Sequence, residues 1–174
     1  MLEHIELHNV LFLDIETVPI YPDYSELPEP FKALWDHKAG FIAKEPQTPY
    51  ETYERAGIYA EFGKIVCISI GAIDEADNGK CSFRVKSFAG EDEVVLLENF
   101  LKLLNEHYKE PNHLLCAHNG KEFDFPFLSR RILINGLKLP KILNTAGKKP
   151  WQVPHLDTLE LWKFGDYKHY SSLN

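Results

Sequence analysis

Two strand-like segments joined by a short polar stretch strongly limit how the middle of the chain can fold. Residues 64–73 (KIVCISIGAI) are rich in β-branched side chains, and residues 81–90 (CSFRVKSFAG) alternate apolar and polar side chains. The pair Asn78-Gly79 between them is a strong signal for a tight hairpin turn. The two segments are therefore predicted to be antiparallel neighbours in a sheet.

Helix-like and strand-like patterns alternate around this hairpin. Strands are predicted at Val10–Glu16, 113–119 and the start of 153–164, and helices at 91–108, 124–135 and the end of 153–164. Because the later strands each follow a helix, crossover connections and parallel pairing are favoured. The chain is thus predicted to be α/β, with a mixed five-stranded sheet flanked by helices.

The segment 91–108 has the clearest helical pattern. Its apolar side chains recur at spacings of three and four, at Val94, Leu97, Leu101, Leu104 and Tyr108. The acidic run 91–93 suits the positive end of the helix dipole.

Residues 19–63 form a long insert between the first two predicted strands. Six of the eleven prolines fall within 19–50, which predicts mostly loop there, with a short helix at 31–37 and another at 50–62. The insert is rich in aromatic residues: Tyr21, Tyr24, Phe31, Trp35, Tyr50, Tyr53 and Tyr59. Two interpretations stay open, a lid over a functional site and a loop packed over one sheet edge.

Composition limits the class of protein. A chain of 174 residues with 44% hydrophobic and 26% charged residues fits a single domain, 1–174. Its three separated cysteines lie in apolar segments and are predicted to be reduced core thiols of a cytoplasmic protein. No apolar run approaches the roughly 20 residues of a membrane span, so no membrane association is expected.

The charge is distributed unevenly. A net charge of −7 argues against broad electrostatic capture of nucleic acid. After residue 116, however, 9 Lys and Arg stand against 5 Asp and Glu. If a polyanion binds, the C-terminal third is the predicted place.

Asp14 and Glu16 interrupt the first predicted strand. Residues two apart in a strand face the same side, so their carboxylates project together and repel unless a cation intervenes. Hard oxygen ligands select Mg²⁺ or Mn²⁺. The alternative is a strand end where both acids reach water or one pairs with a Lys or Arg.

Asp124 supplies a third carboxylate. It heads the helix 124–135 directly after the strand 113–119, and would reach the same sheet edge if that strand lies beside the first. There it would complete a set of metal ligands. It also suits an N-cap, a common role for Asp that does not exclude metal binding.

At this point three segments resemble a known family. "FLDIETVP" (12–19) resembles the first motif, Asp-x-Glu-Thr, of the DEDD 3′–5′ exonucleases, which have a DnaQ-like, ribonuclease H-like fold. "HNGKEFDFPFL" (118–128) resembles their second motif in the Asn-x-x-x-Phe-Asp form of the exonuclease domain of family B DNA polymerases. "HLDTLEL" (155–161) is similar to an Asp-Thr segment further along such domains. The order and intervals match over essentially the whole chain.

The resemblance implies hydrolysis of phosphodiester bonds at the 3′ end of single-stranded DNA or RNA by a two-metal mechanism. The residues implied as catalytic and as ligands of two Mg²⁺ or Mn²⁺ ions are Asp14, Glu16 and Asp124. Those that match the substrate side are Thr17, Asn119 and Phe123. For Thr17 the alternative is simple turn chemistry, and for Phe123 it is core packing in place of stacking on a base.

The third motif of the family has no counterpart. Tyr-x-x-x-Asp or His-x-x-x-x-Asp would supply the fourth ligand and the general base, and neither follows residue 158. Tyr167, His169 and Tyr170 all lack the required Asp. We therefore expect the C-terminal part of the domain to be missing, with 169–174 as the start of a helix. A chain of this kind would have weak or no activity and could self-associate through the surface left uncovered.

Other interpretations remain beside this one. A non-catalytic nucleic-acid-binding domain of the same fold is the main alternative. A phosphatase of the haloacid dehalogenase type would need Asp where Glu16 stands, and Thr17 comes one position too early. His118 is a less favoured candidate base. Four cations could meet phosphates, although each is better interpreted as a solvated charge: Lys121, Arg130, Lys148 and Lys149.

Overall fold

The elements of the chain follow the predicted order. The computed structural model describes residues 3–44, 46–75, 80–166 and 172. Its strands and α-helices are β1 (Val10–Pro19), α1 (Glu29–Ile42), α2 (Pro49–Thr52), β2 (Gly63–Glu75), β3 (Cys81–Ala89), α3 (Glu93–His107), β4 (Leu114–Ala117), α4 (Asp124–Ile134), β5 (Leu156–Asp157) and α5 (Thr158–Lys163). The 3-10 helices are Leu7–Asn9, Tyr24–Glu26, Tyr53–Ile58, Lys141–Leu143 and Pro150–Gln152.

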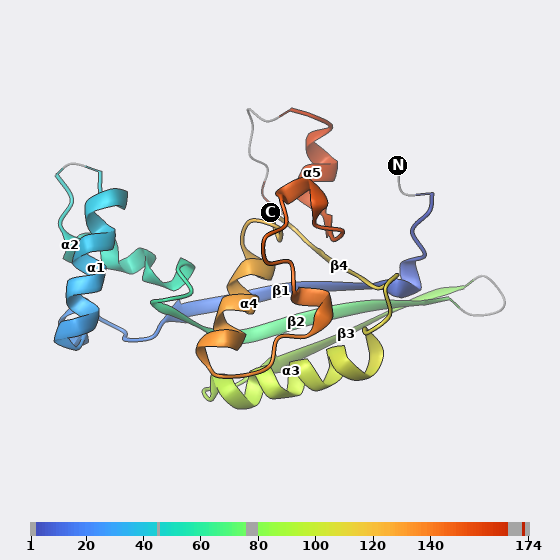
Figure 1. Ribbon diagram of the computed structural model, residues 1–174, viewed down its shortest axis with the longest axis horizontal. Coiled ribbons are helices and arrows are strands. Elements are labelled where there is room, and N and C mark those ends of the chain that lie inside the picture. Colours follow the sequence, from blue (N-terminus) through green and yellow to red (C-terminus); the bar gives the residue numbers. More distant parts are fainter. Residues whose placement is uncertain (1–2, 45, 76–79, 167–171, 173–174) are drawn as a thin grey trace.

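The five strands form one mixed sheet in the order β3-β2-β1-β4-β5 (Figure 1). β2 pairs antiparallel with both β1 and β3, whereas β4 pairs parallel with β1 and β5 pairs parallel with β4. The predicted fold class, a ribonuclease H-like mixed five-stranded sheet flanked by helices, is confirmed. The predicted turn at Asn78-Gly79 lies outside the described residues, but the pairing of β2 with β3 on either side confirms the hairpin.

β1 separates two kinds of side chain. Leu11, Leu13 and Ile15 are buried, while Asp14 and Glu16 are exposed on the opposite face. This alternation follows from the two-residue period of a strand. The pairing with β2 shifts between Glu16 and Thr17, because Glu16 pairs with Cys67 but Thr17 with Ile65. The extra residue is a β-bulge, which commonly re-aims side chains beside functional sites.

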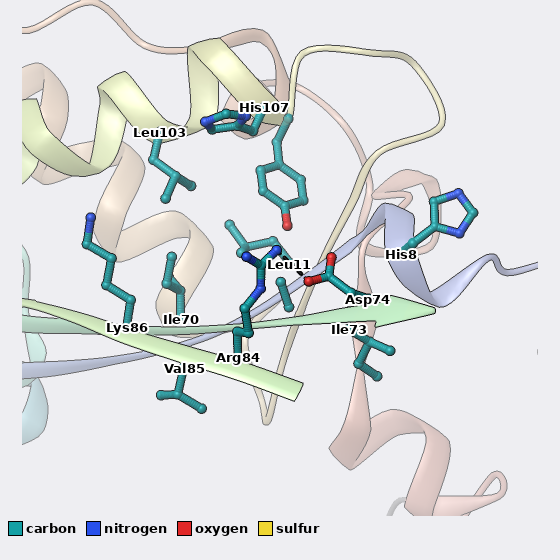
Figure 2. A pocket seen from close by; sticks show the side chains of 12 residues that line it. His8, Leu11, Ile70, Ile73, Asp74, Arg84, Val85, Lys86, Leu103 and His107 are labelled. Atoms are coloured by element: carbon teal, nitrogen blue, oxygen red, sulfur yellow. Dashed lines mark ion pairs between the residues drawn. The ribbon is translucent and has the colours of Figure 1, made fainter. Parts of the chain in front are cut away.

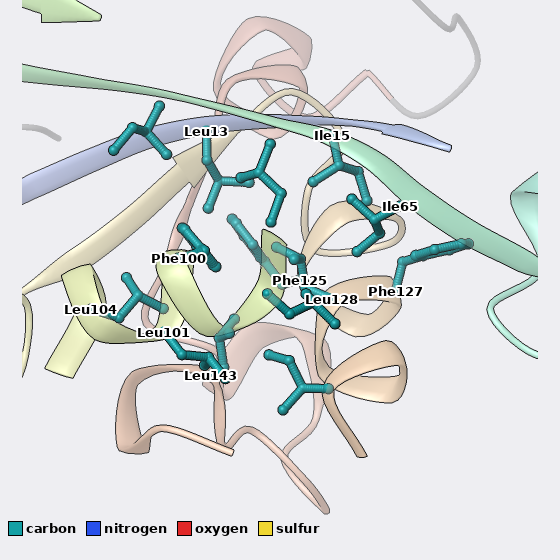
Figure 3. Close-up of a cluster of buried hydrophobic side chains, with 14 of the residues drawn as sticks. Leu13, Ile15, Ile65, Phe100, Leu101, Leu104, Phe125, Phe127, Leu128 and Leu143 are labelled. Atoms are coloured by element: carbon teal, nitrogen blue, oxygen red, sulfur yellow. The ribbon is translucent and has the colours of Figure 1, made fainter. Parts of the chain in front are cut away.

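The core fills the face of the sheet that α3 and α4 cover (Figures 1 and 3). Side chains of β1 and β2 meet those of the two helices there, among them Leu13, Ile15, Ile65, Phe100, Leu101, Leu104, Phe125, Phe127 and Leu128. α3 begins after Asp92, whose carboxylate accepts the backbone N–H groups of Val94 and Val95 at 2.9 and 3.2 Å. Val94 of the apolar repeat is 37% exposed, whereas the buried face of the helix runs through Leu96 and Phe100.

The insert is more helical than predicted. The 14-residue α1 replaces the short predicted helix, because Pro30 falls in its first turn, where the missing N–H costs nothing. Trp35 is fully buried and donates its indole N–H to the carbonyl oxygen of Pro49 at 2.8 Å. It centres a second core, half of it aromatic, made of Leu27, Trp35, Ala39, Tyr53, Ala56 and Phe62. α1 and α2 lie beyond the end of β1, away from α3 (Figure 1).

The three cysteines occupy different environments. Cys116 is buried, and burial together with the charge of Asp157 raises its pKa to about 11. Cys67 is half-buried, but Cys81 is exposed at the start of the edge strand β3. The prediction of three core thiols is therefore wrong for Cys81. In the part of the chain that the structure describes, no helix combines the length and apolar character needed to cross a membrane.

Candidate active site

The two carboxylates of β1 project into solvent. Asp14 and Glu16 are exposed, and neither side chain forms an ion pair or hydrogen bond with another described residue. Phe12, on the same face, contacts Phe83 of β3 edge-on, with 6.1 Å between ring centroids. Of the two branches of the predicted alternative, pairing with a Lys or Arg is not found among the described residues, whereas both acids do reach water.

Asp124 reaches this strand from the start of α4. It is only 2% exposed, and its Oδ1 accepts the backbone N–H of Ile15, the residue between the two β1 carboxylates, at 3.2 Å. Burial and the negative charge of Asp14 raise the pKa of Asp124 to about 7. Asp124 is the first helical residue and Phe123 is the N-cap, so the N-cap interpretation of Asp124 is wrong. Its carboxylate accepts a hydrogen bond from the neighbouring strand.

Asp157 organises the turn that carries the second motif. It is 3% exposed and accepts three backbone N–H groups, from Asn119 at 2.9 Å, Lys121 at 3.1 Å and Leu159 at 3.0 Å. Asn119 has a φ of 59°, a left-handed conformation that Asn adopts more readily than most residues. Asp157 therefore positions the turn that leads to Asp124. The sequence showed the Asp-Thr segment, but gave no signal for this contact.

Other candidates of the second motif are tied to α5. The His118 ring nitrogen Nδ1 lies 2.9 Å from the Thr158 hydroxyl, so this nitrogen is engaged in a hydrogen bond. Lys121 forms an ion pair with Glu160 at 2.7 Å. This pair partly neutralises the positive charge of a residue that is a candidate phosphate contact. These contacts join the second motif to the segment 155–161.

The predicted substrate residues flank the carboxylates. Thr17 is half-buried next to the bulge, and Asn119 is half-buried in the turn. Phe123 is also half-buried, and its ring lies 5.4 Å from that of Phe127. Phe123 packs partly against the main core, so only part of its ring faces outward.

His155 links the strand that leads to the second motif with the segment around Ile142. It is 3% exposed, and its Nδ1 accepts the N–H of Leu115 at 3.2 Å, so the proton is on Nε2, which donates to the carbonyl oxygen of Ile142 at 2.8 Å. Its ring also packs on Phe125. Burial is the main cause that lowers its pKa to about 4, and the positive charges of Lys148 and Lys121 contribute.

We expect stability to fall below pH 6.5 partly because of His155. Its ordinary pKa in the unfolded chain is about 6.5, so its imidazole binds a proton below that pH when the chain is unfolded. In the folded chain the same imidazole stays neutral until about pH 4. Urea unfolding at pH 7 and pH 5 should show wild type losing about 2 kcal/mol more than His155→Gln. Between pH 8 and 7 the two should change in parallel, and parallel loss down to pH 5 would contradict the prediction.

The donor set is chemically suited to a hard divalent cation. Asp14, Glu16 and Asp124 offer only carboxylate oxygens, and the repulsion between Asp14 and Asp124 is what a cation would offset. Among residues 3–44, 46–75, 80–166 and 172, no three His, Cys, Asp or Glu side chains are grouped closely enough to hold a metal ion as they stand. The exposed Asp14 and Glu16 side chains would have to turn toward Asp124.

Known proteins resemble the chain over much of its length. The sequence model of a family described as "Predicted 3'-5' exonuclease related to the exonuclease domain of PolB" matches residues 58–162. The structure of the family B DNA polymerase from the hyperthermophilic archaeon Pyrobaculum calidifontis is similar, with 19% identity and a TM-score of 0.35, over 75% of this chain and 11% of the polymerase. The crystal structure of E. coli exonuclease I in complex with a dT13 oligonucleotide has 10% identity and a TM-score of 0.45, over 89% of this chain and 29% of that protein. The chain thus spans less than a third of either protein. No curated protein matches the sequence.

Proposed function

The chain belongs to the family of predicted 3′–5′ exonucleases related to the exonuclease domain of PolB, and from this premise we propose that it is a metal-dependent nuclease. Its substrate would be the 3′ end of single-stranded DNA or RNA, and its reaction the hydrolysis of the terminal phosphodiester bond. The relation to family B polymerase exonuclease domains, predicted from the motifs, is confirmed by the family match.

One observation carries the proposal. The matched residues 58–162 contain Asp124 but not Asp14 or Glu16. The hydrogen bond from Ile15 to Asp124 brings the first motif against the second, although 109 positions separate them in the sequence. Two distant segments thus supply carboxylates beside one backbone contact, and these could hold metal ions together once Asp14 and Glu16 turn toward Asp124.

Asp14, Glu16 and Asp124 would hold two Mg²⁺ or Mn²⁺ ions. Such ions, when bound, activate a water molecule and stabilise the attacking and leaving oxygens of phosphodiester hydrolysis. The chain itself supplies rigidity to this site, because Asp124 is fixed by Ile15 and its turn is fixed by Asp157.

The terminal nucleotide would lie against the half-buried residues beside these carboxylates. Thr17 follows Glu16 past the bulge, where its backbone and hydroxyl can hydrogen-bond a terminal sugar. The outward part of the Phe123 ring would stack on a base, a contact that tolerates any sequence and is worth about 1–3 kcal/mol. Asn119 would hydrogen-bond the strand from the turn that Asp157 fixes.

Cleavage polarity tests the proposal. A single strand labelled at its 5′ end, incubated with Mn²⁺ and excess protein, should give a ladder that shortens from the 3′ end. Asp14→Ala should remove the ladder, because it removes one of the three carboxylates that would hold the ions. Glu122→Gln is the matched control, because it replaces an exposed carboxyl in the turn just before Asp124. It should cleave as wild type does.

Two results would contradict this function. Equal cleavage by Asp14→Ala would place the reaction elsewhere. Binding of the strand by wild type without any shortening would favour the non-catalytic nucleic-acid-binding domain instead.

A further inference from the structure

Two cavities lie beside the C-terminal end of α3, and their charges differ. The first, of about 570 Å³, opens between α3 and the hairpin of β2 and β3 (Figure 2). Its guanidinium, Arg84, is joined to Asp74 at 2.5 Å, and the ammonium group of Lys86 lies 4.5 Å from the ring centroid of Phe88. The main cation of this cavity already has an anionic partner.

The second cavity is larger and its lysines have no such partner. It has a volume of about 920 Å³ and lies between the end of α3, the start of β4 and the segment 138–148. Four lysines line it, and these are Lys109, Lys138, Lys141 and Lys148. All four are exposed, and none forms an ion pair or side-chain hydrogen bond with another described residue. The lining contains one acid, Glu110.

Unpaired like charges around one hollow repel each other and attract a polyanion. The excess is notable in a chain of net charge −7. The positive charge of Lys148 is among the charges that lower the pKa of His155, a buried residue of the same lining. Leu104 and Leu139 are among the apolar residues of the lining, which suits flat or hydrophobic groups between phosphates.

An exposed aromatic ring lies next to this cavity in the chain. Trp151 stands between Lys148 and Pro154, both of which line the cavity, and 80% of its surface is exposed. Large exposed aromatics beside basic side chains are typical of surfaces that stack the bases of single strands. Lysines for phosphates and an indole for bases together describe one chemical class of ligand.

We propose that this basic groove, defined by Lys109, Lys138, Lys141 and Lys148 and followed in the chain by the exposed Trp151, binds the phosphate backbone of single-stranded nucleic acid away from the reaction site. The inference rests on the proposed function, because it assigns the groove to the distant part of the same substrate. The groove lies at the start of β4, whereas Asp124 follows its end. A strand of four residues spans about 13 Å, so one nucleic-acid chain can occupy both places.

Charge reversal tests the groove through binding alone. Fluorescence anisotropy would measure the affinity for two labelled single strands, one of about 16 nucleotides and one of about 4. These lengths bracket the range that single-strand binding sites cover. Lys138→Glu/Lys141→Glu should weaken binding of the long strand by about 10-fold or more at 0.1 M salt. It should also flatten the dependence of log K on log salt by about 1.4, because each lost phosphate contact removes about 0.7. The short strand should bind wild type and variant alike.

A matched pair of lysines outside the groove controls for net charge. Lys86→Glu/Lys102→Glu makes the same charge change and should keep the affinity for the long strand within about 2-fold. Trp151→Ala should weaken that affinity by about 5-fold or more without changing the salt dependence. If the two double variants have the same affinity and the same salt dependence, the proposed role of the groove in binding is wrong.

Failure of the groove and failure of the proposed reaction give different results. The groove variants should keep their response to Mn²⁺ and their cleavage of the short strand, because their lysines lie outside the carboxylate site. If Asp14→Ala cleaves as wild type does, the proposed reaction is wrong. In that case a weaker affinity of Lys138→Glu/Lys141→Glu for the long strand would still support nucleic-acid binding in the groove.

Discussion

Replacing Asp124 with asparagine is expected to abolish stabilisation of the protein by Mn²⁺ without lowering its stability in metal-free buffer. In wild type the N–H of Ile15 donates to Asp124 Oδ1 at 3.2 Å, and asparagine keeps an oxygen that can accept it. Asparagine also removes a buried charge that Asp14 repels. Metal-free stability should therefore stay equal or rise by about 1 kcal/mol. A ligand carboxylate lost in this way should weaken metal binding by at least about 100-fold.

Thermal unfolding measures both parts of this prediction. Mn²⁺ at 100 times its Kd should stabilise wild type by about 2.7 kcal/mol, which corresponds to a Tm rise of roughly 5–10 °C. Asp124→Asn and Asp14→Asn should show little of this rise, and Glu122→Gln should show all of it. A purely structural role for Asp124 would instead lower the metal-free Tm, and an undiminished Mn²⁺ response in Asp124→Asn would exclude it as a ligand.

The sequence predicts those parts of the site that local patterns encode. The apolar run that ends at Leu13 fixes β1, and a two-residue period then places Asp14 and Glu16 on one face. Asp124 follows a short apolar segment and begins a helical pattern, so its position at a strand end can be inferred. Parallel pairing of β4 with β1 needs only the helix between them. The adjacency of these two strands, on which the expected position of Asp124 depended, is found.

What the sequence does not predict depends on contacts between distant positions. Asp157 accepts N–H groups 36 and 38 positions away, and its own segment gives no sign of those partners. Val94 fits a helical repeat as well as Leu96 does, and only packing against the sheet selects the buried face. The prolines of the insert predicted a loop, but a proline in the first turn permits the helix α1.

The bulge beside Glu16 depends on another such contact. Thr17 pairs with Ile65 and Glu16 with Cys67, so Val66 interrupts the ladder. The N–H of Ile65 also donates to the Oε1 atom of Glu93 at 2.8 Å. The first turn of α3 therefore anchors β2 at the bulge, directly opposite the end of the carboxylate segment. From the sequence, Glu93 could be assigned only a favourable place at the helix start.

Breaking the pair of Glu93 and Arg131 should destabilise the fold by about 3–5 kcal/mol, because it leaves an unpaired charge in the interior. Both residues are buried, and two guanidinium nitrogens of Arg131 donate to the Glu93 carboxylate, Nε at 2.9 Å and Nη2 to Oε2. Arg131 also donates to the carbonyl oxygen of Ala60 at 3.0 Å, and Asn135 donates to Glu93 at 3.0 Å. Burial opposes ionisation of Glu93, but these donors outweigh it and lower its pKa.

Chemical denaturation of Arg131→Met and Glu93→Gln would measure this loss. Arg130→Met is the matched control, since Arg130 is the exposed neighbour of Arg131, and Arg84→Met breaks an exposed ion pair; each should cost less than about 1 kcal/mol. The double variant Glu93→Gln/Arg131→Met should cost clearly less than the sum of the single changes, because it removes both charges together. Additive losses would contradict coupling of the two residues. Because Arg131 lies on the helix that begins at Asp124, and Glu93 holds β2 at the bulge, the single variants should also reduce the Mn²⁺ response at temperatures where the chain remains folded.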